Sequence, residues 1–280
     1  MISEAKLNIP TIRIEPTRGW AALKLHELWA YRELLYFLVW RDVKVRYKQT
    51  VIGVGWTILQ PLMTMVVFTM IFGNFAKVPS DGVPYPIFAY SALLPWNLFA
   101  GALNRCTMSL VGSANLITKV YFPRLIVPAS ATIAGVLDFA ISFVFLLAMM
   151  VWFHIAPTWG ALAVPIFVFL TLISVLSVGL WLSALNVRYR DVGQAIPFLI
   201  QIWMFLCPVA YPISLVPEKW RLLYSLNPMV GVIEGFRWAL LGNDSPDFRV
   251  IGLSTLVLVV LLIGGLFYFK RIERTFADVV

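Results

Sequence analysis

The sequence of 280 residues is 60% hydrophobic and 13% charged, and its mean hydropathy is +0.84. Soluble domains carry about a quarter charged residues, so this chain has too few polar side chains to cover a folded surface in water, which excludes a soluble enzyme or binding domain. The net charge of +8 does not indicate nucleic-acid binding, because lysine and arginine gather beside apolar segments, as on the cytoplasmic side of a membrane. We therefore expect an all-α integral membrane protein.

The first 50 residues precede any apolar span. Residues 1–24 hold charges and prolines without the apolar core of a cleavable signal peptide, which predicts a cytoplasmic N-terminal tail. In residues 25–50, apolar side chains from Leu25 to Tyr47 recur at three- and four-residue steps, which predicts an amphipathic helix. Such a helix lies in the cytoplasmic headgroup plane, although an ordinary solvated charged face would give the same pattern. The basic residues predicted to lie at the membrane interface are Arg41, Lys44, Arg46 and Lys48.

Residues 51–270 are predicted to form the transmembrane domain. A hydrocarbon core of about 30 Å needs about 20 apolar residues per helix. Six stretches meet this length, at 51–72, 87–104, 125–153, 160–185, 193–213 and 250–269. Lysine and arginine beside both ends place both termini in the cytoplasm, with residues 271–280 as a C-terminal tail, and an even number of crossings follows.

A further apolar segment, 222–241, carries Pro228, Glu234 and Arg237. Counting it as a span would put the termini on opposite sides of the membrane. We therefore expect a re-entrant or interfacial segment on the outer face, between the last two spans. Broken helices are tolerated there when protein or a water-filled cavity surrounds them.

Motifs for catalysis and phosphate binding are missing from the sequence. It has no G-x-x-x-x-G-K-[ST] loop for ATP phosphates, no HExxH or GxSxG motif, and no cysteine or histidine cluster for a metal. We expect no ATPase activity and no cofactor or metal on this chain; a membrane-embedded glycosyl- or acyltransferase is less favoured but left open. Asp138 is the one acidic residue deep in an unambiguous span, and we expect it to form a structural polar contact, with Arg105 as a candidate partner.

Several motifs together resemble one family. RDVKVRYKQTVIGVGWTILQP at 41–61 joins a basic helix to a glycine-containing span entry, and KVYFPR lies at 119–124. NVRYRDV follows at 186–192, and YPISLVP and LNPM lie within 211–229. Over roughly residues 30–275, the chain resembles the transmembrane subunit of bacterial polysaccharide ABC exporters, the ABC-2 type permeases that export O-antigen, capsule or teichoic acid.

The resemblance implies partners and a location. It implies a homodimer of six-span subunits in the bacterial cytoplasmic (inner) membrane, surrounded by membrane lipid. It also implies two copies of a separate nucleotide-binding ATPase subunit that hold ATP and Mg, and a lipid-linked polysaccharide as substrate. Nucleic acid is not an expected partner. An ABC-2 permease for a drug or another lipid is the main alternative.

The resemblance also assigns residues to sites. It places the contact with the ATPase on the two inner loops, at Asn115, Leu116, Ile117, Lys119, Val120, Tyr121, Pro123, Arg124, Arg188, Arg190 and Asp191. It places an outer gate at Tyr211, Pro212, Asn227, Pro228, Glu234 and Arg237. Within residues 114–124, four apolar residues from Leu116 to Tyr121 can share one face at helical spacing, and Pro123 would stop the helix. Without the resemblance, a loop whose charges only fix topology explains this segment equally well.

Aromatic residues make up 15% of the chain. Tryptophan and tyrosine gather at membrane interfaces and phenylalanine suits lipid, which accounts for many of them. A glycan, however, offers an apolar wall little to hold except the apolar faces of its sugar rings. We therefore predict a substrate path lined by Trp56, Phe72, Trp96 and Trp203.

Overall fold

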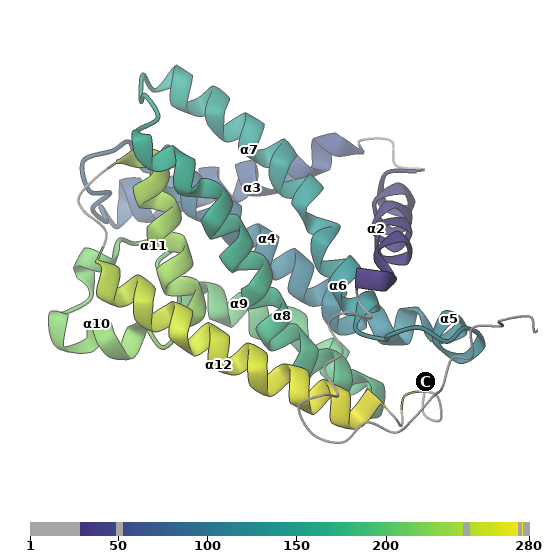
Figure 1. The fold of residues 1–280 in the computed structure, drawn as a ribbon. Coiled ribbons are helices and arrows are strands. Elements are labelled where there is room, and N and C mark those ends of the chain that lie inside the picture. Colours follow the sequence, from purple (N-terminus) through teal and green to yellow (C-terminus); the bar gives the residue numbers. More distant parts are fainter. Residues whose placement is uncertain (1–28, 49–52, 243–246, 274–275, 277–280) are drawn as a thin grey trace, which may run out of the picture.

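The structure, a computed structural model, describes residues 29–48, 53–242, 247–273 and 276. Across these residues the chain is largely helical and contains no strand, which confirms the predicted all-α class. The predicted tails at 1–24 and 274–280, apart from Phe276, and the ends of 25–50 lie outside the described residues. The elements in Figure 1 are α2 (Arg32–Tyr47), α3 (Val54–Phe68), η2 (Thr69–Phe75), α4 (Tyr85–Gly112), α5 (Ala114–Lys119), α6 (Ile126–Ile133), α7 (Gly135–Trp152), η3 (Trp159–Ala163), α8 (Val164–Arg188), α9 (Asp191–Phe205), η4 (Ile213–Leu215), α10 (Glu218–Tyr224), α11 (Pro228–Leu241) and α12 (Phe248–Ile272).

Five helical stretches of the described chain are long and apolar enough to cross a membrane. They are α3 with η2, α4, α6 with α7, η3 with α8, and α12. They correspond to five of the six predicted spans, because length and hydropathy are what a sequence records most directly. The chain is therefore a multi-pass membrane protein.

The segment 193–213, predicted as the fifth span, is not one continuous helix and is not among the five candidate spans, so this crossing is not confirmed. α9 ends at Phe205 after 15 residues, a length of about 22 Å at about 1.5 Å per residue. The hydrocarbon core is about 30 Å thick. Turns follow α9 and contain Pro208, which has no N–H to continue a helical hydrogen-bond ladder.

α4 is the central helix of the bundle. It contacts α3, α6, α7, α8, α9 and α11, and most of its side chains are buried. Gly179 permits the close approach of α8, since a Cβ atom at this position would lie 2.5 Å from the Sγ atom of Cys106 on α4. Small residues at helix contacts let membrane helices pack in this way. Cys106 is free and buried, and its place in this contact fits a structural role.

The chain between α9 and α12 folds into the two helices α10 and α11. Asn227 caps α11, because its side chain accepts a hydrogen bond from the Met229 N–H, and Pro228 takes the first helical position. Gly242 follows the helix with a φ of 66°, a left-handed conformation that glycine adopts without strain. α11 is buried against α4, α8 and α12. The predicted segment 222–241 is thus broken before its proline and does not count among the five candidate spans.

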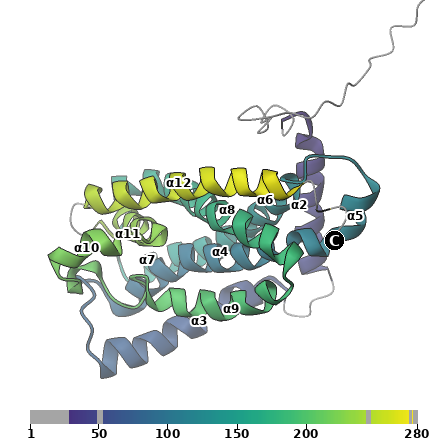
Figure 2. The same ribbon diagram turned by 90° about the horizontal axis from the view of Figure 1, so that it is seen from below.

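α2 lies across one end of the bundle. In Figures 1 and 2 it runs across the direction of α12, at the end where α5 and the last turns of α12 also lie. Leu38 on α2 is 1% exposed and belongs to a buried cluster with Ile117 and Phe269. Tyr36, which the predicted apolar face included, is 71% exposed. Apolar residues therefore lie on more than one side of this helix, and the predicted amphipathic pattern is not confirmed.

Candidate functional site

A charged cavity of about 270 Å³ lies between α2, α3, α4 and α7. Its wall combines polar and charged groups with apolar ones. The lining residues are Arg46, Trp56, Thr57, Gln60, Pro61, Leu94, Asn97, Leu98, Ala100, Gly101, Arg105, Gly135, Asp138, Phe139 and Ser142. Of the predicted site residues, the cavity brings together only Arg46 and Trp56 within the part of the chain that the structure describes.

Asp138 on α7 is the centre of the charges in this cavity. It accepts close hydrogen bonds from the Arg46 guanidinium and from the Tyr47 hydroxyl, both on α2. Arg105 on α4 forms a longer ion pair with it, with 3.7 Å between Nη1 and Oδ2. The predicted contact between Arg105 and Asp138 is confirmed, but the part played by α2 was missed. Burial and the hydrogen bond to Asp138 raise the pKa of the Tyr47 hydroxyl, so this group stays protonated and donates.

Polar side chains also continue along α4 toward the middle of the span. Asn97, Asn104 and Arg105 recur at helical spacing on this helix, and Asn97 and Gln60 on α3 are exposed in the single chain. A polar group facing hydrocarbon without a partner costs several kcal/mol. This face is therefore turned toward water or protein rather than lipid. The spacing of the polar residues on α4 was the sequence signal that could have found them.

The four aromatic residues predicted for a substrate path occupy different surroundings. Trp56 is 57% exposed, whereas Trp96 is 3% exposed and packs 5.5 Å from the Phe99 ring. Trp203 lies 5.2 Å from the same Phe99 ring, so the structure brings these two tryptophans into one cluster. Phe72 is half-buried and forms an edge contact with a neighbouring phenylalanine on α3. Their role in a path stays a prediction.

The predicted outer-gate residues form two hydrogen-bonded groups around the start and the middle of α11. In the first, Asn227 accepts a hydrogen bond of 3.0 Å from the Trp203 Nε1–H, and the hydroxyls of Tyr211 and Tyr224 lie 2.9 Å apart. Pro212 and Pro228 are buried beside them. A second cavity, of about 570 Å³, is lined by Trp203, Trp220, Tyr224 and mostly apolar neighbours. This region can hold apolar groups, and its role as a gate stays a prediction.

The second group is centred on Arg237. Its guanidinium donates to the Val209 carbonyl at 2.9 Å and to the Glu234 carboxylate at 3.2 Å, and it lies 3.7 Å above the Phe88 ring. Arg237 thereby ties α11 to the turn after α9 and to α4. A buried guanidinium that has these partners is held in one position, because leaving it unpaired is strongly destabilising.

The first predicted ATPase contact is a short helix followed by an extended turn. α5 ends at Lys119, and Val120 is extended, so the predicted helical face from Leu116 to Tyr121 is not formed as one face. Ile117 is buried, whereas Val120 and Tyr121 are 52% and 76% exposed. The helix ends four residues before Pro123, earlier than we expected. The exposed apolar anchor is therefore Val120 with Tyr121, and Asn115 and Lys119 are exposed beside it.

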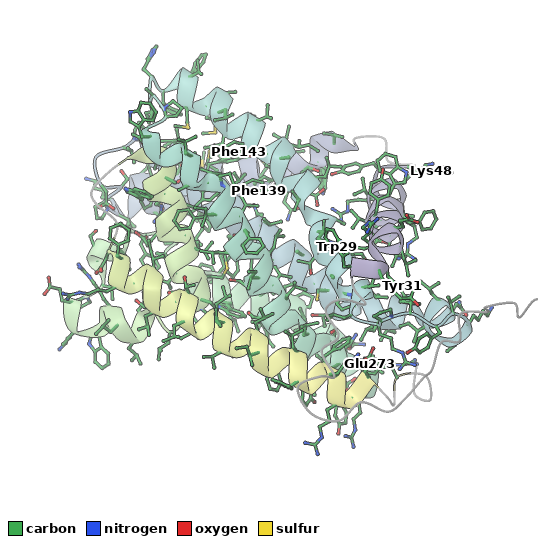
Figure 3. The ribbon with its side chains drawn as sticks, in the orientation of Figure 1. Trp29, Tyr31, Lys48, Phe139, Phe143 and Glu273 are labelled. Atoms are coloured by element: carbon green, nitrogen blue, oxygen red, sulfur yellow. The ribbon has the colours of Figure 1, made fainter. Side chains whose placement is uncertain are left out.

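Arg124 fastens the end of this segment to α12. Its backbone N–H donates to the Glu273 side chain at 3.1 Å, and its guanidinium donates to the Glu273 carbonyl. Lys270 also forms an ion pair of 2.6 Å with the same carboxylate. Figure 3 shows Glu273 at the end of α12, close to the end of the bundle that holds α5. This tie between the first inner loop and the C-terminal helix was not foreseen from the sequence.

The remaining predicted charged residues lie mostly at the surface. Arg188, Arg190 and Asp191 are exposed at the junction of α8 and α9. On α2, Arg41 pairs with Asp42 at 2.8 Å, and Lys44 and Lys48 are exposed; Figure 3 shows Lys48 at the opposite end of this helix from Trp29. Arg46 differs from this group because it points to Asp138 rather than outward.

The bundle of membrane-spanning helices and the charged cavity inside it define a multi-pass protein of the transporter class. The family model for the ABC-2 type transporter matches residues 33–241. The chain belongs to this family, and the resemblance drawn from its motifs is confirmed.

Relatives are similar along nearly their whole length. The chain is 30% identical to the O-antigen export system permease protein RfbA of Myxococcus xanthus, over 91% of this chain and 98% of the relative. It is 27% identical to RfbA of Klebsiella pneumoniae, over 89% of this chain and 95% of the relative. It is 25% identical to the polysialic acid transport protein KpsM of Escherichia coli, over 83% and 91%.

Proposed function

We propose that this chain is the permease subunit of an ATP-driven exporter that moves a lipid-linked polysaccharide, similar to O-antigen, across the bacterial cytoplasmic membrane. The observation that carries the proposal is the similarity to an O-antigen export permease over 98% of that relative. The drug or general lipid permease is less favoured, because relatives named for O-antigen and polysialic acid export share the family and the length.

The membrane topology in this proposal has six crossings with both termini in the cytoplasm. α9 and the turns after it supply the crossing that hydropathy and helix length leave out, and α10 and α11 form the re-entrant outer segment. The arrangement supports this, because α2, α5 and the last turns of α12 lie at one end of the bundle, and α10 lies at the other (Figure 2). Lys44, Lys119 and Arg271 at the first end fit the excess of basic residues on the cytoplasmic side.

In the working transporter, two copies of this chain bind two ATPase subunits that hold ATP and Mg. The sequence has no phosphate-binding loop of its own, so the energy must enter through contact with another protein. Val120 and Tyr121 provide an exposed apolar anchor beside α5, and aromatic anchors of this kind dominate many interfaces. The exposed loop at Arg188 and Arg190 lies at the start of α9 and supplies the second contact.

The path for the glycan runs along the exposed polar face of α3 and α4 in this proposal. Gln60 and Asn97 on this face suit the hydroxyl groups of a sugar, and the exposed Trp56 offers a ring for stacking. A second copy of the chain would close the other side of the path. The buried Trp96 would support the wall rather than touch the glycan.

The proposal is tested by complementation in a strain that lacks its own polysaccharide exporter. The chain is expressed with the ATPase encoded beside it and the matching glycan synthesis genes, and surface glycan is measured on intact cells. We expect surface glycan with the active ATPase and intracellular lipid-linked glycan with an ATPase changed at its Walker A lysine. Equal surface glycan from both strains, or none from either while both subunits are in the membrane, would contradict the proposal.

A further inference from the structure

Arg105 occupies a space that two glycines make for it. A Cβ atom built on Gly135 would lie 2.4 Å from the Nη2 atom of Arg105, and one built on Gly101 would lie 3.2 Å from Nη1. A side chain at position 135 would displace the guanidinium, which is the flexible end of Arg105, from its present position. Facing helices α4 and α7 therefore hold this group at the wall of the charged cavity.

The guanidinium has more donors than close partners. Arginine carries five N–H donors, and within the described part of the chain Arg105 makes a hydrogen bond of 3.5 Å to the Ala131 carbonyl and the ion pair of 3.7 Å to Asp138. Both contacts are long for a charge-assisted hydrogen bond, which is about 2.7–2.9 Å. Arg46 and Tyr47 take the close positions on the Asp138 carboxylate.

The charges in the cavity do not balance. Two guanidinium groups, of Arg46 and Arg105, and one carboxylate, of Asp138, line it. The other polar lining groups are the side-chain amides and hydroxyls of Gln60, Asn97, Thr57 and Ser142, which are neutral. A guanidinium that is partly removed from water without a full partner is unfavourable, and an oxyanion beside it offsets this cost. The excess positive charge favours an anion over a cation.

We propose that this cavity is a binding site for a phosphate-type oxyanion, and that Arg105 is the residue that holds it. A phosphate or pyrophosphate group can accept two parallel hydrogen bonds from a guanidinium, with the amides of Gln60 and Asn97 as further donors. Asp138 keeps Arg46 engaged, so Arg105 is left for the ligand. If the proposed export function holds, the ligand is the phosphate that joins the glycan to its lipid; the same chemistry also fits a phospholipid headgroup or a free phosphate.

The test measures binding of inorganic pyrophosphate to the permease–ATPase complex in phosphatidylcholine nanodiscs by equilibrium dialysis. ATPase subunits with the Walker A lysine changed to alanine limit binding at the nucleotide sites. We expect saturable binding to the complex and a loss of about tenfold or more in affinity in Arg105→Gln, the size of one charge-assisted contact. Arg105→Lys should be intermediate, because lysine keeps the charge but not the paired donors. Arg41→Gln removes the same charge outside the cavity and should bind as the unchanged complex does.

A second variant covers the case in which Arg105→Gln fails to assemble. Gly135→Ala keeps every charge and pushes the guanidinium aside, so it should weaken pyrophosphate binding while Gly252→Ala, which has open space around it, should not. Adding phosphatidylglycerol to the nanodiscs distinguishes the possible sources of the phosphate group. If phosphatidylglycerol competes with pyrophosphate, a lipid headgroup is a ligand of the site. If it does not compete, a free or carrier-linked phosphate is favoured.

The proposed site would be overturned if the unchanged complex, Arg105→Gln and Gly135→Ala bound pyrophosphate with equal affinity. It would also be overturned if Arg41→Gln lost as much affinity for pyrophosphate as Arg105→Gln. Binding is measured without transport, so this result is separate from the proposed function. A complex that exports glycan but binds no pyrophosphate would refute the site alone, and one that binds pyrophosphate at Arg105 but exports no glycan would refute the export function alone.

Discussion

Changing Asp138 to asparagine removes the one carboxylate among the residues that line the charged cavity. Arg46 and Tyr47 then lose the charged acceptor that ties α2 to α7, and Arg46 and Arg105 face each other without a counter-charge. The amide can still accept a hydrogen bond, so the shape is kept and the charge is lost. We expect α2 to detach more often from the end of the bundle.

The size of this effect follows from the burial of the pair. Breaking a fully buried ion pair by removing one partner costs about 3–5 kcal/mol, but the side chains of Arg46 and Asp138 are 27% and 25% exposed. Screening by water reduces the loss, and we expect about 2 kcal/mol. If α2 opens as a local unit, its open population rises by about 30-fold.

A cysteine at position 38 reports this opening, because Leu38 is the buried residue of α2 and is 1% exposed. In a background with Cys106 and Cys207 changed to alanine, labelling of Leu38→Cys by a water-soluble thiol reagent should be about 30-fold faster with Asp138→Asn. Asp42→Asn, which loses the pairing with Arg41 on the same helix, serves as the control and should change little. Equal labelling rates with and without Asp138→Asn would refute the account of α2.

Three further variants test other contacts. Tyr121→Asp places a charge in the exposed anchor beside α5 and should abolish co-purification of the ATPase without lowering the amount of permease in the membrane. Normal association of the ATPase would contradict the assignment of this anchor. Glu273→Gln weakens the contact with Arg124 and should lower the ATPase rate per complex, measured by phosphate release, by about threefold while the ATPase stays associated. An unchanged rate would contradict a coupling role of this contact. Trp56→Ala should lower export of surface glycan while the complex assembles normally. Trp96→Ala should instead lower the yield of folded protein, measured by size-exclusion chromatography, since only the Trp96 ring is buried. The opposite pattern would contradict the assignment of Trp56 to the path and of Trp96 to the wall.

Hydropathy and length were sufficient to predict five spans and the all-α class. They did not show that the helix within 193–213 ends early, because apolar composition continues past the end of α9 into turns that contain Pro208. They also did not show which side of α2 is covered by the protein, because this helix carries apolar residues on several sides and packing against α6 decides which of them are covered. Local pattern fixes whether a helix forms more reliably than which face it buries.

The candidate site was predicted only in part for a related reason. Asp138 and Arg105 were identified because an ionisable residue in a span needs a partner. The contact of Arg46 with Asp138 joins residues that are 92 positions apart, and nothing in the sequence near either residue records it. The glycine at 135 likewise carries no sign that its missing side chain makes room for Arg105. Contacts between distant elements require the fold.

The central claim, that this chain exports a lipid-linked polysaccharide, is tested most directly in proteoliposomes. The permease–ATPase complex is reconstituted with lipid-linked glycan, and the fraction of glycan protected from an external glycosidase is measured with and without ATP. The account predicts that ATP raises the protected fraction, and that neither ADP nor an ATPase changed at its Walker A lysine does so. Equal protected fractions with ATP, with ADP and with the changed ATPase, although the unchanged complex hydrolyses ATP, would contradict it.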